Sequence, residues 1–199
     1  MNIIVGKNFQ EFRVANANFI AVDIGASSGR LLLGKWNGSQ FDLEELWRFP
    51  NESVSVNGHM HWDVLRLWHE IKQGLLHYRK TYDEPLAGIS VDTWGVDFGL
   101  LDKAGNLMGN PYHYRDHRTN GLVEKGFGYL SKADTYAVTG IQFMQINTIY
   151  QLLSMVESKH PQLEQAHTLL MMPDLFHYWL SGEKCVEYTD ASTSQMLVA

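Results

Sequence analysis

Three short apolar runs near the start of the chain constrain its fold most. Residues 18–24, 29–36 and 41–48 are rich in Ile, Val, Leu, Phe and Trp, and the turn-like segments GASS and NGSQ separate them. Apolar runs of this length, joined by such turns, predict three consecutive antiparallel strands. The chain therefore begins by building a sheet.

An amphipathic segment follows these runs. Between residues 62 and 80 apolar side chains recur at three- and four-residue spacing, which predicts a helix with Asp63 as its N-cap. The sequence LAGISVD at 86–92 then predicts a buried strand. A strand that rejoins an earlier sheet through a helix gives an α/β layer architecture, with the helix packed on the sheet.

The second half of the chain is mostly helical in its pattern. A hairpin with its turn at 103–106 comes first, and helices interrupted by glycines follow between 119 and 158. A short strand at 168–173 then leads into a helix that we expect to be capped by Asp174 and to stop at Gly182. The interrupting glycines are Gly126, Gly128 and Gly140.

Composition narrows the classes of partner. The 199 residues are 45% hydrophobic and 19% charged, which is typical of a folded globular chain, and a net charge of −6 without a Lys/Arg cluster argues against nucleic acid. The single cysteine, Cys185, has no partner for a disulfide or at metal-ligand spacing. No stretch resembles a signal-peptide core or a membrane span. We therefore expect a cytoplasmic protein with a small-molecule partner and no nucleic-acid or membrane partner.

A loop of small residues follows the first predicted strand, which ends at Asp23. Its glycines would permit positive φ and close approach to the main chain, and the amides and hydroxyls between them can donate to phosphate oxygens. The loop is not a Walker loop, which needs a lysine and a following helix. Asp23 could hold Mg²⁺ directly or through water, and an ordinary Gly/Ser hairpin is the alternative. The candidate phosphate-binding residues are Asp23, Gly25, Ala26, Ser27, Ser28, Gly29 and Arg30.

The segment SVDTWGVDF at 90–98 carries sugar-site residues. Trp94 offers a flat apolar face to the C–H bonds of a sugar, Gly95 allows a ligand near the main chain, and Asp92 and Asp97 can accept hydrogen bonds from hydroxyls. The segment lies at the carboxyl end of a predicted parallel strand, where open α/β sheets bind ligands. A core tryptophan beside two solvated carboxylates is the alternative.

A third segment, YHYRDHRTNG at 112–121, concentrates charge between aromatic residues. Arg115 and Arg118 could clamp a phosphate or carboxylate, but an Arg–Asp cluster with Asp116 is more often a structural ion pair. His117, next to two arginines, is more often a hydrogen-bonding surface residue than a base.

Other functions remain open on these residues alone. A ribonuclease H-like nuclease would use Asp23 and Asp92 to hold two metal ions, although the acidic balance argues against it. A glycoside hydrolase would use Asp92 and Asp97 beside Trp94, but would not need a phosphate loop. A non-catalytic sugar- or nucleotide-binding module is the third possibility.

Six segments, in order, resemble the amino-terminal domain of the FGGY carbohydrate kinases. The resemblance runs from about Ala17 to the end, and DTWGVDF and YRDHRTNG favour the branch that phosphorylates L-rhamnulose over the xylulose and glycerol kinases. It implies a ribonuclease H-like mixed sheet flanked by helices, as in the actin-like ATPases. The segments are AVDIGASSGR, GISVDTWGVDFGLLD, YRDHRTNG, TGIQFMQINTIYQL, LLMMPDLFHYWLSG and EYTDASTSQML.

The resemblance also implies a reaction. ATP·Mg²⁺ and the sugar would lie between two related domains, with Ala26 to Arg30 on the phosphates, Asp23 facing the magnesium, and Gly95 at the sugar beside Trp94 and Asp92. The γ-phosphoryl group would pass to the 1-hydroxyl of L-rhamnulose; a kinase of the same family that acts on another ketose or polyol is the alternative. The family's proton acceptor lies in a His-Asp-Thr motif that this sequence lacks, so we expect no catalytic residue here.

The same resemblance sets the expected domain organisation. Residues 1–16 would be an N-terminal extension, and residues 17–199 the amino-terminal kinase domain. The carboxy-terminal domain, which completes the cleft in this family, would be absent, and the isolated chain would be inactive.

Overall fold

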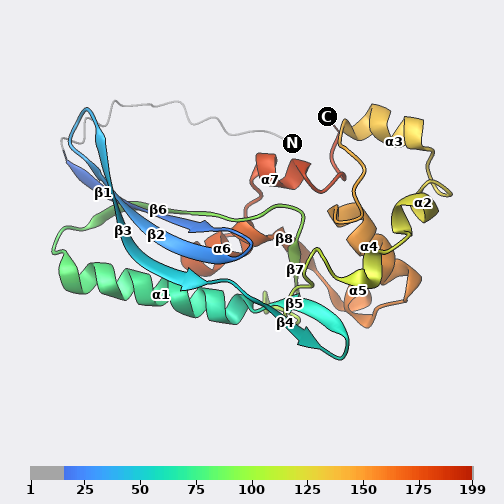
Figure 1. Ribbon diagram of the computed structural model, residues 1–199, viewed down its shortest axis with the longest axis horizontal. Helices are drawn as coiled ribbons and strands as arrows, with labels where there is room; N and C mark the ends of the chain where they lie inside the picture. The colour runs from blue at the N-terminus through green and yellow to red at the C-terminus, as the bar shows by residue number, and fades with distance from the viewer. Residues whose placement is uncertain (1–15, 199) are drawn as a thin grey trace.

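The computed structural model describes residues 16–198 (Figure 1). The extension predicted at 1–16 therefore lies outside the described residues, apart from its last one. A four-stranded sheet has the order β3-β2-β1-β6. Strand β1 pairs antiparallel with β2 and parallel with β6, and β2 pairs antiparallel with β3, so the three predicted antiparallel strands are confirmed. These strands are β1 (Ala17–Ile24), β2 (Ser28–Trp36), β3 (Phe41–Pro50) and β6 (Leu86–Asp92).

Helix α1 (Val64–Thr81) runs along the sheet, below it in Figure 1. As predicted, Asp63 caps it, and its side chain accepts a hydrogen bond from the main-chain N–H of Arg66 at 3.1 Å. The side chains of Leu67 and Ile71 are buried in the core with alternate residues of β1 and β2. Gly74 has no room for a side chain, because Leu31 of β2 lies directly against it. Helix and sheet therefore pack closely.

Strand β6 is less buried than its apolar sequence predicts. Val91 is buried, whereas Ile89 is 37% exposed. The physical reason is position, since β6 is an outer strand of the sheet in the described part of the chain. On the face away from α1, Phe41 and Leu43 of β3 are also exposed.

A hairpin that the sequence reading missed lies between β3 and α1. Strands β4 (Ser53–Val56) and β5 (His59–Trp62) pair antiparallel. The turn between them is Asn57-Gly58, with φ of 52° and 84°, and two positive φ values in a row are what a tight hairpin turn with right-handed strand twist requires. Trp62 consequently ends a strand and does not begin the helix.

The predicted second hairpin is only partly correct. Its turn forms, with Asp102 and Asn106 hydrogen-bonded. However, β7 (Phe98–Leu101) meets the returning segment only in one bridge, at Leu107. The regular antiparallel partner of β7 is β8 (Thr168–Met171).

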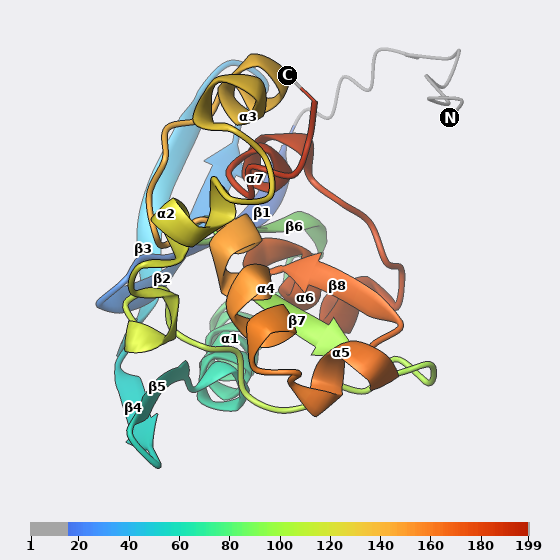
Figure 2. The same ribbon diagram turned by 90° about the vertical axis from the view of Figure 1, so that its right-hand side faces the viewer.

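Short helices follow β7, as expected. Gly126 ends α2, and Gly140 takes the left-handed conformation that ends α3, with φ of 64°. Figure 2 shows α4 in front of β7 and β8, and Met155 of α4 packs with Phe98 and Leu100 of β7. The elements are η1 (His117–Thr119), α2 (Leu122–Gly126), α3 (Lys132–Thr139), α4 (Thr148–Glu157) and α5 (Pro161–Gln165).

Helix α6 (Met172–Ser181) follows β8 without a loop, and α7 (Tyr188–Ser192) comes after it. Gly182 ends α6 with φ of 79°, as predicted. Asp174 is not the N-cap, which is a correction: Met171 holds that position, and Asp174 lies buried in the first turn. Within residues 16–198, none of the helices is long and apolar enough to cross a membrane.

Candidate functional site

The site is built where strands β1, β2 and β6 end or begin together. In the strand register, Asp23 of β1 stands opposite Asp92 of β6 and opposite Arg30 of β2. Because β1 and β6 are parallel, their carboxyl ends lie at the same edge of the sheet, which is where open α/β sheets bind ligands. The fold thus brings together charged residues from two separate sequence motifs.

The loop from Gly25 to Ser28 leaves hydrogen-bond donors free. Its ends are joined by the bond from the Gly25 N–H to the Ser28 carbonyl, 2.9 Å long. Residues Gly25, Ala26 and Ser27 are exposed, and the main-chain N–H groups of Ala26 and Ser27 have no acceptor among the described residues. Neighbouring free N–H groups in a turn form a concave site for an anion.

Asn51, just after β3, holds this loop through two hydrogen bonds. Its side-chain amide donates to the Gly25 carbonyl at 2.8 Å, and its main-chain N–H donates to the Ser27 carbonyl at 3.0 Å. Asn51 is buried, and its Oδ1 has no partner in the described part of the chain. The loop conformation is therefore set by a residue outside the loop.

Asp23 has one oxygen engaged and one free. Arg30 reaches Oδ2 with Nε at 3.0 Å and with a terminal nitrogen at 2.9 Å. No donor among the described residues reaches Oδ1, and the side chain is 42% exposed. A free carboxylate oxygen at the mouth of an anion-binding loop suits a hydrated Mg²⁺ ion, which keeps most of its waters and takes few carboxylates.

The glycines of this loop have a different role from the predicted one. Neither Gly25 nor Gly29 is among the glycines with positive φ. Gly29 is buried in the strand pairing, and a Cβ there would overlap the ring of Phe49. Position 29 therefore requires glycine because the ring of Phe49 packs against it, and not because a phosphate must approach the main chain.

Asp97 is fully buried, and both of its oxygens are engaged. Oδ2 accepts from Trp62 Nε1 at 2.5 Å, from Trp94 Nε1 at 2.9 Å and from the Tyr114 N–H at 3.1 Å. Oδ1 accepts from Gln151 Nε2 at 2.7 Å. Burial raises the pKa of Asp97 to about 6, although these hydrogen bonds lower it. The direct contact with a sugar that the sequence suggested is not available to this side chain, which instead orients its neighbours.

Trp94 is held in an aromatic stack. Its ring lies 3.9 Å, centre to centre, from that of Trp62, which in turn stacks on His113 at 3.9 Å. Trp62 is fully buried, whereas Trp94 is half-buried. Burial lowers the pKa of His113 to about 4, so this ring is neutral at pH 7. The stack fixes one face of Trp94 and its indole N–H.

Gly95 and Val96 are clamped by the region around α7. A Cβ on Gly95 would lie 3.0 Å from Thr193 Oγ1 and 3.2 Å from Asp190 Oδ1, so this glycine accommodates α7 and the residue that follows it. Val96 has φ of 69°, which a β-branched residue rarely adopts. Thr148 Oγ1 donates to its carbonyl at 2.6 Å, and its N–H donates to Thr193 Oγ1 at 3.0 Å. Strain of this kind, held by surrounding contacts, is common at functional sites.

Asp190 is a titratable residue that the sequence reading did not single out. Burial, together with the negative charges of Asp174, Glu187, Asp92 and Asp97, raises its pKa to about 7. Its Oδ2 is buried without a hydrogen-bond partner among the described residues. At pH 7 the Asp190 carboxyl, which lies next to Gly95, is therefore protonated in about half of the molecules.

Arg118 has a structural role, because its guanidinium forms hydrogen bonds within the protein. Its terminal nitrogens donate to the Gln151 carbonyl at 2.8 Å, the Gln151 side chain at 2.6 Å and Ser154 Oγ at 2.7 Å. Arg115 lies over the ring of Tyr114 at 5.2 Å. Segment 112–121 thus ties η1 to α4 and does not add an arginine clamp to the Asp23–Asp92 edge.

Several residues of the site were not predicted. Asn51 and Gln151 act through contacts between distant segments, which no local pattern reveals. The segment EYTDASTSQML carried part of the family resemblance, but not a role for any of its residues. The unpredicted residues are Asn51, Trp62, Gln151, Asp190 and Thr193.

Comparison with protein families shows which family has this architecture. Residues 18–198 match the N-terminal domain of the FGGY family of carbohydrate kinases. The chain belongs to this FGGY family. Among curated FGGY kinases, it is 44% identical to a rhamnulokinase of Bacteroides thetaiotaomicron over 92% of its length. It is 45% identical to a rhamnulokinase of Halalkalibacterium halodurans over 90% of its length. The chain spans 37% and 38%, respectively, of the lengths of these two relatives.

Solved structures of FGGY kinases share the fold. The chain superposes on a gluconate kinase from Lactobacillus acidophilus with a TM-score of 0.80 at 17% identity, covering 92% of this chain and 37% of that one. A xylulose kinase from Rhodospirillum rubrum gives 0.78 at 19%, covering 91% of this chain and 38% of that one. The expected mixed sheet with flanking helices of the actin-like ATPase fold is confirmed.

Proposed function

We propose that this chain is the phosphate-binding and sugar-facing part of an ATP-dependent kinase that phosphorylates L-rhamnulose at its 1-hydroxyl. The observation that carries the proposal is the register pair of Asp23 and Asp92, which joins the loop and the sugar motif at one sheet edge. The names of the relatives that match at 44% and 45% identity support the choice of sugar. A cytoplasmic location is part of the proposal, because the reaction would use ATP.

The loop would hold the phosphates of ATP. The N–H groups of Ala26 and Ser27, which have no acceptor among the described residues, would donate to anionic oxygens together with the hydroxyls of Ser27 and Ser28. Arg30 lies next to them, paired with Asp23. A guanidinium beside the loop adds positive charge where the polyphosphate needs it.

Asp23 would hold Mg²⁺ through its free Oδ1, with water between them. When bound, magnesium neutralises charge on the phosphate oxygens of ATP. The chain's own contribution is to keep Asp23 ionised and oriented, because Arg30 holds its other oxygen in place.

The sugar would lie against Trp94, with Asp92 beside it. The exposed part of Trp94 offers an apolar face, and exposed Asp92 can accept from sugar hydroxyls. Asp97 would act indirectly by fixing the indole N–H of Trp94. Gly95 would contribute its main chain. Thr193 packs against Gly95 and accepts a hydrogen bond from the N–H of the next residue, Val96, which fixes this stretch of backbone.

The proton acceptor for the sugar hydroxyl would lie outside this chain. Asp97 is buried and takes part in four hydrogen bonds, and Asp23 is ion-paired. We therefore propose that a carboxy-terminal domain supplies the acceptor and the adenosine pocket. Burial of Asp97 also argues against a glycoside hydrolase that would use Asp92 and Asp97 as its two carboxylates.

The choice of sugar can be tested by thermal shift. L-rhamnulose should raise the melting temperature of the chain, whereas D-xylulose and glycerol at the same concentration should not. The variant Trp94→Ala should lose the shift. Equal shifts with L-rhamnulose and D-xylulose would contradict the assignment to L-rhamnulose.

A further inference from the structure

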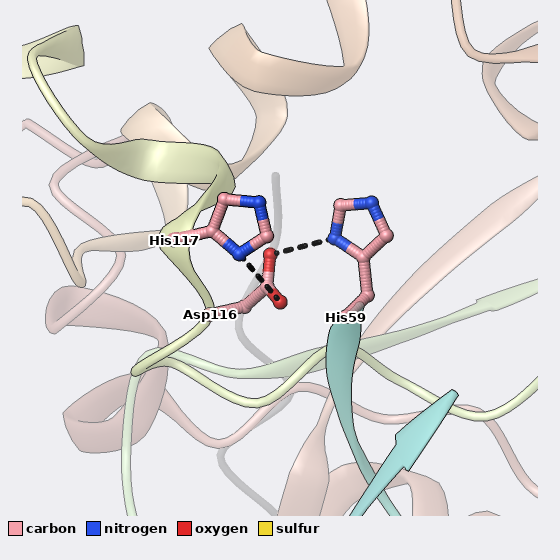
Figure 3. Close-up of side chains that lie close together, drawn as sticks. All are labelled: His59, Asp116 and His117. Carbon is pink, nitrogen blue, oxygen red and sulfur yellow. Dashed lines mark hydrogen bonds and ion pairs between the residues drawn. The ribbon is translucent and has the colours of Figure 1, made fainter. Parts of the chain in front are cut away.

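A cluster of two histidines and one aspartate lies outside the site described above (Figure 3). His59 begins β5, directly after the Asn57-Gly58 turn, while Asp116 and His117 lie at the start of η1. The hairpin β4–β5 and η1 are far apart in the sequence, yet their side chains meet around one carboxylate. The proposed kinase reaction uses none of these residues.

The geometry of this cluster, the His59–Asp116–His117 triad, is close to that of a metal site. His59 Nδ1 is 3.1 Å from Asp116 Oδ1, and His117 Nδ1 is 3.8 Å from Asp116 Oδ2. The candidate ligand atoms all lie within 4.8 Å of one another. The two imidazole rings are parallel within 9°, with centres 5.0 Å apart. In Figure 3 both rings turn a nitrogen toward the carboxylate between them.

We propose that the His59–Asp116–His117 triad binds a divalent late transition metal ion, with Zn²⁺ as the best fit. A tetrahedral zinc ion with bonds of about 2.0–2.1 Å holds its ligand atoms about 3.4 Å apart. The 3.1 Å from His59 Nδ1 to Oδ1 and the 3.8 Å from His117 Nδ1 to Oδ2 lie on either side of this value, each to a different oxygen of the Asp116 carboxylate. Two imidazoles and one carboxylate are a ligand set that zinc uses with water as a fourth ligand.

The carboxylate is already fixed in the position that a metal needs. Asp116 is buried, and its Oδ2 accepts from the Met60 N–H at 2.7 Å while its Oδ1 accepts from the Arg118 N–H at 3.0 Å. Backbone donors of this kind orient a ligand without neutralising it.

The two histidines leave a path for the ion. The side chain of His59 is 38% exposed and that of His117 is 65% exposed, so solvent reaches the open side of the triad. An exposed imidazole can move to bring the ligand atoms, which lie within 4.8 Å of one another, to the separation that zinc needs. Tyr112 supports His59 from the other side, ring edge to ring face, at 5.6 Å.

One charge opposes cation binding. Arg118 Nε lies 4.0 Å from Asp116 Oδ1 and has no hydrogen-bond partner among the described residues. The terminal nitrogens of Arg118 point to Gln151 and Ser154, so the guanidinium does not cover the carboxylate as a bidentate partner would. The lone pairs of Asp116 that face the histidines stay available.

Zinc at this place would clamp the hairpin β4–β5 to η1. The segment just before η1 also meets the hairpin, through the bond from the His113 N–H to the Met60 carbonyl, 3.0 Å long. A metal bridge would reinforce that contact and raise the stability of the chain without touching the Asp23–Asp92 edge. The same ligands would not favour Mg²⁺, which prefers oxygen ligands.

Zinc titration of the chelator-treated 199-residue chain tests the proposal. Every protein would carry Cys185→Ser, because this exposed thiol could bind zinc on its own. The variants are His59→Ala and His117→Ala, and the matched control is His69→Ala, an exposed histidine on α1. Calorimetry with ZnCl2 measures affinity and stoichiometry, and MgCl2 serves as the comparison ion.

The expected result is one zinc ion per chain, with at least about tenfold weaker binding in both triad variants and unchanged binding in His69→Ala, since even outer-shell changes cost about 10–100-fold at metal sites. Equal affinity in the parent and both triad variants would overturn the proposal, as would the absence of one-to-one binding. If the variants fail to fold, Co²⁺ added to the parent decides: visible bands of a tetrahedral ion support the site, and their absence refutes it.

Discussion

Asp23 and Asp92 stand opposite each other at the carboxyl ends of the parallel strands β1 and β6. Arg30 pairs with the same Asp23 from the other side, through Oδ2. The result is a row of charge, Arg30, Asp23 and Asp92, along one edge of the sheet, next to a loop with free N–H groups. A nuclease would need further carboxylates here, and the described residues supply no cluster of three metal-binding side chains at this edge.

Removing the charge of Asp23 should weaken ATP binding. We expect Asp23→Asn to lower the affinity for ATP·Mg²⁺ about 5- to 30-fold, because one charge contact in a partly exposed site is worth roughly 1–2 kcal/mol. Sugar binding should be unchanged. Glu44→Gln, which breaks the exposed ion pair with Lys35 on the same sheet, is the control. Unchanged ATP·Mg²⁺ affinity in Asp23→Asn would remove this residue from the site.

Gly29→Val should act mainly on stability. The new side chain would overlap Phe49, and overpacking of this kind costs about 1–3 kcal/mol. Urea unfolding measures the loss, and Gly29→Val should cost less when it is made in a Phe49→Ala chain than in the parent chain. Gly25→Ala is the control, because a Cβ there would make an ordinary contact 3.5 Å from the Ser28 carbonyl. Full stability of Gly29→Val would show that Phe49 can move away.

Asp97→Ala should be strongly destabilising. It leaves the buried indole N–H of Trp62 without an acceptor, and an unsatisfied buried donor costs about 1–3 kcal/mol. Chemical denaturation of the purified variants measures it. Asp97→Asn, which keeps one acceptor oxygen, should lose less. A stable Asp97→Ala chain with lost sugar binding would instead indicate direct contact with the sugar.

Trp94→Ala should separate the two ligands. Sugar affinity should fall, because the apolar face disappears, while the affinity for ATP·Mg²⁺ stays nearly unchanged. Trp94→Phe keeps an aromatic face but loses the bond to Asp97, so it should retain part of the sugar affinity. Calorimetry with each ligand checks both variants. Equal loss of both affinities would assign Trp94 a folding role.

The titration of Asp190 predicts a pH dependence of stability. Its pKa rises from 3.8 to about 7 on folding, so the folded state holds this proton more tightly than the unfolded state. The associated stability is complete below pH 3.8 and is lost as the pH rises through about 7. Solvent screening of this half-buried group reduces the effect to about 1–2 kcal/mol.

Asp190→Asn removes this titration. Between pH 4.5 and 7.5 the parent should lose about 1–2 kcal/mol more stability than the variant. Asp97 acts in the same direction and His113 in the opposite one, because its pKa falls to about 4. Both residues are present in parent and variant, so their effects cancel in the difference. Parallel pH profiles would show that Asp190 does not hold the proton.

Local patterns were enough to predict the central elements. Strands β1 to β3 and helix α1 follow from apolar periodicity, from short turns and from the cap at Asp63. The hairpin β4–β5 was missed although Asn57-Gly58 is a strong turn signal, because its strand residues are largely polar or exposed. For this hairpin, the turn dipeptide predicts the structure better than the apolar pattern of the strands does.

Pairings between distant segments could not be predicted in the same way. Nothing in VDFGLLD indicates that β7 pairs with β8, because that contact depends on how the intervening helices fold back. The same holds for Asp97, whose carboxylate resembles that of Asp92 in sequence but is surrounded by Trp62, Trp94 and Gln151 in space. The position of a motif residue along the chain therefore does not determine its exposure, which depends on tertiary packing.

The most direct test of the central claim is calorimetric titration of the 199-residue chain with ATP·Mg²⁺, coupled to an assay of ADP release in the presence of L-rhamnulose. The account predicts that ATP·Mg²⁺ binds and that no sugar-dependent ADP forms, because the loop is present and the proton acceptor lies elsewhere. Absence of ATP binding would contradict the role of the loop. Steady, sugar-dependent release of ADP would contradict the placement of the proton acceptor, and would point to Asp92 as the base.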